Sequence, residues 1–298
     1  MTAALPAGQP RQFAKLCDVR DWDDPELLRV LREILPERDP ATHVERKVWE
    51  FAMLALFLEH TGRMNEQTEA LAVGAGDERI VFWLANRLGR VVATDIYGDG
   101  DFAGREARST MLDDPAAHAP LPYREDRLEV RWMDARRLAF PDESFDVVFS
   151  LSSFEHFGGP LDVAAAAREL GRVLRPGGHA FVVTECFVKR HWVNAAPADL
   201  AVRLATLGRK RRRAGLRRRA VVVEVFTPRE LERLIVRPSG LQLMQPLDLS
   251  LPGTSRVNVT RTDENGLHPE RGDYWPHVIL KADRSLFTSV SLPLQKPA

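Results

Sequence analysis

The stretch LAVGAGDERIVFWLANRLGRVVATD, residues 71–95, decides the fold of this chain. It opens with a short apolar run that ends in the turn Gly74-Ala75-Gly76, and a helical pattern over residues 78–88 follows. A second apolar run over residues 90–95 ends in an aspartate, Asp95. Parallel strands need a crossover between them, so a strand, a glycine turn, a helix and a strand of these lengths predict one unit of a parallel sheet.

The same alternation continues beyond this stretch. We predict further strands over 128–134, 145–151 and 179–185, with helices over 105–112, 162–174 and 227–236. Two late apolar runs, 241–249 and 287–294, have no helix between them and are therefore expected to be antiparallel. The expected fold is α/β: an open, mostly parallel seven-stranded sheet with helices on both faces.

Residues 1–65 show helical patterns instead. Asp24 followed by Pro25 is a typical helix start, and a second helix is predicted over 41–59 with its apolar residues along one face. We expect an N-terminal helical cap over 1–65 and a region carrying the sheet over 66–298, folded as a single globular unit.

Composition excludes several classes of protein. The chain has 298 residues, with 42 Lys and Arg against 42 Asp and Glu, so its overall field does not attract nucleic acid. Two cysteines make neither a disulfide framework nor a metal cluster, and we predict no metal site. The longest apolar run, residues 51–58, is far below the roughly 20 residues of a membrane helix, and the start resembles no signal peptide. We expect a cytoplasmic protein.

The predicted strands end in residues suited to a nucleoside. Ligands of open parallel sheets bind at the carboxyl ends of the strands. The glycine turn lets a ligand approach the backbone closely, and Asp95 at the end of the next strand can hold a ribose diol. Asp134 ends the third predicted strand, and the fourth runs through Ser150.

The charges after the glycine turn indicate which nucleoside. A dinucleotide site needs a third glycine where this chain has Arg79, and Asp77 and Glu78 would repel a pyrophosphate. The same carboxylates suit a ligand whose tail carries an ammonium and a sulfonium, as S-adenosylmethionine (SAM) does. An NAD-dependent enzyme is therefore the weakest alternative.

Four segments make the chain resemble the class I SAM-dependent methyltransferases. These are LAVGAGDE (71–78), VVATDIYG (91–98), MDARRLAFPDESFDVVFSLSSFEHFGG (133–159) and RELGRVLRPGGHAFVVTE (168–185), of which the last two are the most specific. The resemblance covers residues 70–185, with a plausible continuation to the end, and implies the Rossmann-like fold expected above, with SAM as the cofactor.

The resemblance also implies roles for single residues. Gly74, Ala75 and Gly76 would line the methionine part of SAM, and Asp95 would accept both ribose hydroxyls, with Ile96 against the adenine. Asp134 would face the adenine amino group beside the backbone of Ala135, and Ser150 would lie beneath the methionine tail.

One position departs from the family pattern. Members usually carry an acid two residues before the first glycine, where this chain has Ala72. That acid helps to hold the methionine ammonium. Our hypothesis is that Glu78, at the start of the following helix, takes over part of this role.

Glu155 and His156 follow the fourth predicted strand, where a methyl acceptor would enter. His156 suits proton removal near neutral pH, but the pair could equally stabilise the turn beneath the cofactor. Other candidates for acceptor contact are Glu185 and the pair His191-Trp192, with loop packing as the alternative. Arg46 and Trp49 lie in the region that often folds over the cofactor in this family, although core packing is the favoured interpretation of Trp49. We assign His277 no role.

We therefore predict methyl transfer from SAM to an oxygen or nitrogen of a small molecule or sugar. Two alternatives stay open. One is a nucleic-acid methyltransferase that uses residues 209–219, where eight of eleven residues are basic, although a solvated segment is the favoured interpretation. The other is a non-catalytic SAM-binding or scaffold protein, which Ala72 suggests.

Overall fold

The structure is a computed structural model with side chains. It describes residues 11–40, 44–100, 102–189, 225–253, 255, 259–263, 266–269, 277–282 and 285–298. The predicted candidates His191, Trp192 and the basic run 209–219 lie outside these ranges.

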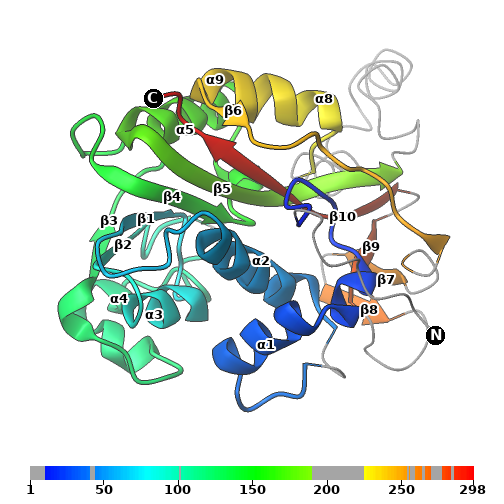
Figure 1. The fold of residues 1–298 in the computed structure, drawn as a ribbon, viewed down its shortest axis with the longest axis horizontal. Coiled ribbons are helices and arrows are strands. Elements are labelled where there is room, and N and C mark those ends of the chain that lie inside the picture. Colours follow the sequence, from blue (N-terminus) through cyan, green and yellow to red (C-terminus); the bar gives the residue numbers. More distant parts are fainter. Residues whose placement is uncertain are drawn as a thin grey trace, which may run out of the picture.

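One sheet organises the described chain (Figure 1). Its strands lie in the order β3-β2-β1-β4-β5-β10-β9-β7-β8, and β6 also pairs with β10. Every pair from β3 to β5 is parallel, whereas β10 runs antiparallel to β5, β6 and β9. Helices α5, α8 and α9 cover one face, and α2 and α3 cover the other, with α1 packed outside them. The predicted α/β fold, with a mostly parallel sheet and helices on both faces, is confirmed.

The strands of the parallel half overlap the predicted runs, but the third ends two residues earlier than predicted, and the fifth begins five residues before and ends four residues after its predicted bounds. They are β1 (Glu69–Val73), β2 (Arg90–Asp95), β3 (Leu128–Trp132), β4 (Phe145–Leu151) and β5 (Leu174–Lys189). The remaining strands are β6 (Gln242–Leu243), β7 (Val259–Asp263), β8 (Gly266–Pro269), β9 (Ile279–Ala282) and β10 (Ser285–Gln295).

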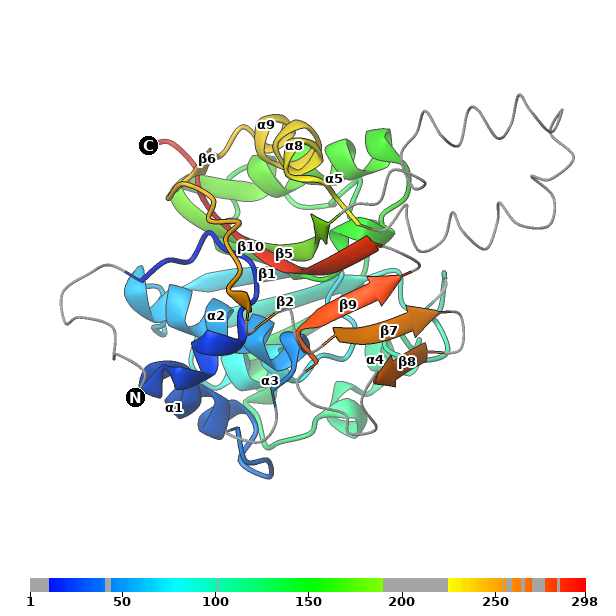
Figure 2. The same cartoon turned by 90° about the vertical axis from the view of Figure 1, so that its right-hand side faces the viewer.

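The predicted count of seven strands is wrong, because ten strands form the sheet within the described residues. Figure 2 shows β9, β7 and β8 as an extension of the sheet beyond β10. These strands have four or five residues each, and sequences such as VTRTD lack the apolar alternation that makes a strand recognisable. The late antiparallel pair is confirmed, although its first member, β6, is only two residues long.

Local signals set the helix ends. The longer helices are α1 (Pro25–Ile34), α2 (Arg46–His60), α3 (Arg79–Ala85) and α5 (Pro160–Val173). Asp24 caps α1 by accepting from the Glu26 N–H at 2.9 Å, and Pro25 is its first residue, as predicted. Shorter segments are η1 (Val19–Asp23), α4 (Thr110–Asp113), η2 (Pro115–His118), η3 (Glu125–Arg127), η4 (Phe154–His156), α8 (Pro228–Leu231), the π-helical η7 (Glu232–Val236) and α9 (Arg237–Ser239).

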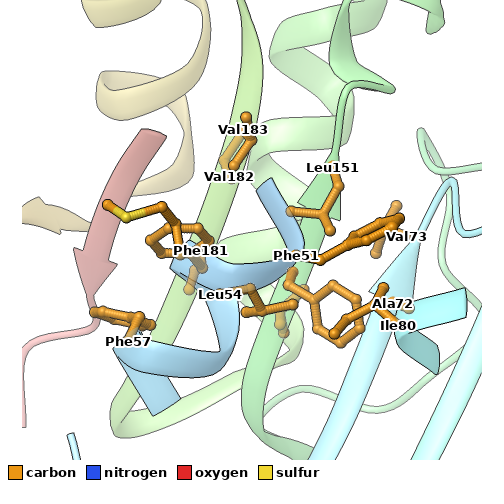
Figure 3. Close-up of a cluster of buried hydrophobic side chains, with 14 of the residues drawn as sticks. Phe51, Leu54, Phe57, Ala72, Val73, Ile80, Leu151, Phe181, Val182 and Val183 are labelled. Atoms are coloured by element: carbon orange, nitrogen blue, oxygen red, sulfur yellow. The ribbon is translucent and has the colours of Figure 1, made fainter. Parts of the chain in front are cut away.

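Helix α2 is buried on nearly every side, not only along the predicted face. It lies between α1 and the sheet, with contacts to β5 and β10. Its Phe51, Leu54 and Phe57 reach into the sheet side chains (Figure 3). Trp49 is fully buried and donates from Nε1 to Asp21 at 2.7 Å, in agreement with the packing interpretation. Residues before and after position 65 thus share one core.

None of the described helices combines the length and the hydropathy that crossing a membrane requires.

Phe181 tests how much the contact between α2 and the sheet contributes to stability. The side chain is fully buried in β5, and its ring stacks on Phe57 at a centroid distance of 4.9 Å. Phe181→Ala should lower the free energy of unfolding by about 3–5 kcal/mol, because it removes apolar burial and leaves a cavity. Leu161→Ala, at a side chain that is 85% exposed, should leave it nearly unchanged. Urea denaturation measures both, and equal effects of the two variants would contradict the prediction.

Candidate active site

A cleft of about 770 Å³ opens at the carboxyl ends of the parallel strands. This is the size of a ligand site and the position at which open parallel sheets bind ligands. Nine of the predicted site residues line it: Gly74, Gly76, Glu78, Asp95, Ile96, Asp134, Ala135, Glu155 and His156. Ala75 and Ser150 are not among its lining residues.

The glycine turn brings backbone to the cleft wall. Gly74 and Gly76 have φ angles of +67° and +50°, a conformation that side chains disfavour. A Cβ at Gly74 would lie 2.6 Å from the Cβ of Ser153, so the turn after β4 can pack against it because the residue has no side chain. Ser153 fixes this approach by donating its hydroxyl to the Gly74 carbonyl at 2.7 Å.

Asp95 lies at the end of β2, against the glycine turn. Its two carboxylate oxygens accept from the backbone N–H groups of Gly76 at 2.9 Å and of Ile96 at 2.7 Å. Burial raises its pKa, and these two hydrogen bonds oppose the rise. Each oxygen retains a second lone pair, so the carboxylate can still accept from a ligand diol.

The carboxylate of Asp134 already forms an ion pair with an arginine of the same loop. Arg136, two residues on, binds both carboxylate oxygens, with Nη2 at 2.6 Å from Oδ2 and Nε at 2.9 Å from Oδ1. Hydrogen bonding to Arg136 lowers the pKa of Asp134. Arg136 also reaches Asp162 at 3.4 Å and lines the cleft itself. A nucleobase amino group would share Asp134 with this guanidinium, a competition that the sequence did not reveal.

Ser150 does not reach the surface of the cleft, so its predicted place beneath the methionine tail stays a prediction. Ser150 lies within β4, is 1% exposed, and its hydroxyl has no hydrogen-bond partner among the described residues. β4 extends one residue beyond Ser150, to Leu151. Ser152 and Ser153, which follow the strand, line the cleft. Ser152 has a φ of 51°, and this left-handed turn directs the chain away from the strand.

Glu78 forms an ion pair with Lys47 of α2. The Lys47 ammonium also lies 3.3 Å from Glu50 and donates to the Leu151 carbonyl at 3.1 Å. Burial raises the pKa of Glu78 to about 7 despite the neighbouring ammonium. Burial opposes the charged form of Lys47 as well, but Glu78 and Glu50 outweigh it and raise the Lys47 pKa.

Arg46, next to Lys47 in α2, also lines the cleft. Its guanidinium binds Glu185 of β5 at 2.7 Å and Ser289 of β10 at 3.1 Å. Glu185 and Ser289 are register partners, so Arg46 ties α2 to this antiparallel pair. Burial raises the pKa of Glu185 to about 7, against the opposing charge of Arg46. Glu185 faces the cleft, as one of the two predicted alternatives requires.

Glu155 and His156 differ in environment. Glu155 is 3% exposed and accepts from the Thr184 hydroxyl at 2.6 Å, and burial raises its pKa. The His156 ring is exposed in the cleft and meets Phe102 edge-on, with centroids 4.7 Å apart. Of the two, His156 is the one a ligand can reach directly.

Sequence reasoning missed several lining or supporting residues. Lys47, Ser152 and His277 line the cleft, and Glu50 is buried beneath it. Glu50 could have been noticed in the sequence, because it is a charged residue among the apolar residues of α2. Backbone pairing places His277 at the cleft, because its N–H donates to the Val44 carbonyl at 2.9 Å. No local sequence pattern predicts this contact. Within the described chain, no group of three His, Cys, Asp or Glu side chains could hold a metal ion.

The cleft is acidic. Eight lining residues are carboxylates, and three carry the permanent cations of Arg and Lys. The carboxylates are Glu45, Glu78, Asp95, Asp99, Glu106, Asp134, Glu155 and Glu185; the cations are Arg46, Lys47 and Arg136. This balance attracts a cationic ligand and repels a pyrophosphate. SAM, with a sulfonium, an ammonium and a ribose diol, fits the residues present.

Residues 71–182 match the family model described as a methyltransferase domain. The matched segment begins within β1, ends within β5 and includes the lining residues from Gly74 to Gly159. SAM is accordingly the cofactor of this site.

Curated relatives and a solved structure are methyltransferases by name. The chain is 44% identical over 54 residues to 27-O-demethylrifamycin SV methyltransferase of Amycolatopsis mediterranei, covering 18% of this chain and 19% of that protein. It is 28% identical over 191 residues to methyltransferase GfsG of Streptomyces halstedii, covering 61% and 55%. The matches thus span about a fifth and about half of these relatives. A SAM-dependent methyltransferase structure from Methanosarcina mazei aligns with a TM-score of 0.44 at 18% identity, covering 78% of this chain and 94% of that one.

Asp95→Ala should weaken SAM binding about tenfold or more, because hydrogen bonds to an ionised carboxylate contribute about 1.5–3 kcal/mol each. Calorimetric titration with SAM and S-adenosylhomocysteine measures this. Asp99→Ala removes a carboxylate from the same cleft at an exposed position and serves as the control. Unchanged affinity in Asp95→Ala would contradict the ribose role.

Glu78→Gln tests whether Glu78 replaces the acid missing at Ala72. In the unmodified protein, SAM should bind more tightly at about pH 7.5 than at about pH 6, because Glu78 loses its proton over this range and only the carboxylate attracts an ammonium. The variant should bind SAM about tenfold more weakly at the higher pH and lose most of this pH dependence.

Glu106→Gln, which also removes one cleft carboxylate, is the matched control for Glu78→Gln. Titrations at both pH values measure the two variants. A Glu78→Gln protein with the affinity and pH profile of the unmodified chain would refute the replacement.

Proposed function

We propose that this class I SAM-dependent methyltransferase transfers the methyl group of SAM to an oxygen or nitrogen of a small molecule or sugar. The observation that carries the proposal is the lining of the cleft. Glu155, His156 and Glu185 line the same cleft of about 770 Å³ as the residues expected to bind the nucleoside. That volume accommodates a cofactor and leaves room for a small acceptor.

An oxygen acceptor is the form of the proposal we favour. The name of the Amycolatopsis relative describes transfer to an oxygen of a demethylated small molecule. The acidic lining of the cleft also disfavours acceptors that carry phosphate or carboxylate groups. A neutral hydroxyl compound satisfies both observations.

The chemistry supplied by bound SAM is a methyl group on a sulfonium, which is transferred by in-line displacement. The residues of the chain align the acceptor oxygen and exclude water, and this positioning supplies much of the rate. The imidazole of His156 would accept the proton that the acceptor hydroxyl loses on methylation. Glu155, buried next to it, stabilises the resulting imidazolium.

Glu185 is a second candidate for the proton acceptor. It faces the cleft, and its pKa of about 7 suits proton transfer near neutral pH. Arg46 holds one of its oxygens at 2.7 Å and so fixes its orientation. The run 209–219, on which the nucleic-acid alternative depends, lies outside the described residues.

His156→Gln should lower kcat about a hundredfold and leave the Kd for SAM unchanged, because general bases contribute about 10²–10⁴-fold. The assay follows transfer of a labelled methyl group from SAM to a panel of neutral hydroxyl and amine compounds, with total RNA as a further acceptor. His60→Gln, at an exposed position on α2, is the control.

Methylation of RNA without methylation of any small molecule would refute the proposed acceptor class. Full activity of His156→Gln on a methylated compound would leave the acceptor class intact and remove His156 as the base. Glu185→Gln then tests the second candidate in the same assay.

A further inference from the structure

Two aromatic rings meet across the cleft. Phe102 follows β2, His156 belongs to η4 after β4, and both residues line the cleft. Their rings stand edge to face, with centroids 4.7 Å apart and an interplanar angle of 64°. We infer that this pair is a clasp over the nucleoside, which has to open whenever SAM enters and S-adenosylhomocysteine leaves. The inference rests on SAM as the cofactor and does not depend on the identity of the methyl acceptor.

The sheet order places this clasp above the glycine turn. β1 lies between β2 and β4, so the segments that follow β2 and β4 start two strand spacings apart, about 10 Å. A contact between them therefore crosses the carboxyl end of β1, where Gly74 and Gly76 line the cleft.

The expected ribose ligand lies beside the same turn. The Asp95 carboxylate accepts from the Gly76 N–H at 2.9 Å. Burial raises the pKa of Asp95, and His156 is close enough for its charge to oppose the rise. The clasp thus stands next to the place where the ribose of SAM is expected.

His156 is the fixed half of the clasp. Its backbone N–H donates to the Ser153 carbonyl at 2.9 Å, and the Ser153 hydroxyl donates to the Gly74 carbonyl at 2.7 Å. The two residues before His156 in η4, Phe154 and Glu155, are buried. The turn after β4 is therefore anchored both to the glycine turn and to the core.

Phe102 is the movable half. Its side chain is half-buried at the edge of the core, and its ring also meets the guanidinium of Arg105, 5.3 Å from the ring centroid. The Arg105 side chain is exposed and can follow the ring. The Phe102 carbonyl accepts from the Ala107 N–H at 3.0 Å, which holds the backbone in place. Rotation of the ring about its side-chain bonds therefore opens the clasp without a movement of the loop.

A closed clasp has two effects on the reaction. It narrows the opening of the cleft beside the ribose, which helps to exclude water while the methyl group is on the cofactor. Because the same contact has to break before the product leaves, its strength also influences how fast the cofactor exchanges.

The rates of exchange distinguish a clasp from an ordinary ligand contact. A clasp is closed both in the free protein and around the bound nucleoside. Its loss therefore raises the association and the dissociation rate constants by the same factor and leaves Kd unchanged. A side chain that only contacts the nucleoside acts mainly on the dissociation rate constant, so its loss raises Kd as well.

Stopped-flow measurement of S-adenosylhomocysteine binding gives both rate constants. Phe102→Ala should raise each of them about threefold to tenfold, the contribution of one edge-to-face aromatic pair, and leave Kd unchanged. Phe102→Tyr keeps the ring and should keep both rate constants.

Phe140→Ala is the matched control. Phe140 is also half-buried, meets Phe145 edge to face with centroids 5.0 Å apart, and has the Arg131 guanidinium 5.3 Å from its ring centroid. It is not among the described residues that line the cleft, so its loss should leave both rate constants unchanged.

His156→Gln removes the other half of the clasp. It should raise both rate constants as Phe102→Ala does. The double variant should be no faster than either single variant, because both substitutions open the same contact. His156 is exposed, so His156→Gln tests the clasp even if Phe102→Ala does not fold.

Three results would overturn the inference. The first is a pair of rate constants that neither single variant changes. The second is a rise of the dissociation rate constant alone with a matching rise of Kd, which would make Phe102 a simple contact of the nucleoside. The third is a double variant in which the two single effects multiply. None of these measurements uses a methyl acceptor, so each of these results leaves the proposed acceptor class intact.

Discussion

A buried carboxylate, that of Glu50, is the constraint on which the rest of the site depends. An ionised group removed from water costs several kcal/mol unless partners compensate it. Here the partners come from distant parts of the chain, because Ser152 follows β4 and Ser289 lies in β10, 102 and 239 residues away. The cations of the same helix complete the shell, with Lys47 at 3.3 Å and Arg46 at 3.5 Å. The hydrogen bonds and ion pairs of Glu50 therefore fix the positions of α2, the turn after β4 and β10 relative to one another.

The cations around Glu50 also pair with carboxylates that line the cleft. Lys47 and Arg46 each bind Glu50 on one side and a cleft carboxylate on the other, Glu78 for the first and Glu185 for the second. The two ion pairs reach different elements, because Glu78 precedes α3 and Glu185 lies in β5. Two contacts that line the cleft thus begin at adjacent residues of one helix.

The parts of the fold that depend on local sequence could be predicted. The bounds of β4 and the Asp24 cap agree with expectation, because apolar runs and capping residues act over a few positions. Nine of eleven predicted site residues line the cleft, since the carboxyl ends of parallel strands meet at one edge. Ser150 is buried and Ser152 lines the cleft instead, because alternation along a strand does not show where the strand stops facing the core. The Glu50 shell could not be predicted, because its partners are brought together only by the completed sheet.

The position of β10 has a consequence for synthesis on the ribosome. The strand lies between β5 and β9, yet it is made after both, and it supplies the hydroxyl that holds Glu50. Until Ser289 has left the exit tunnel, the first helices and the parallel strands can collapse around α2 without satisfying its carboxylate. A nascent chain therefore has to keep Glu50 in contact with water, and the cleft acquires its final walls only when the last strand docks.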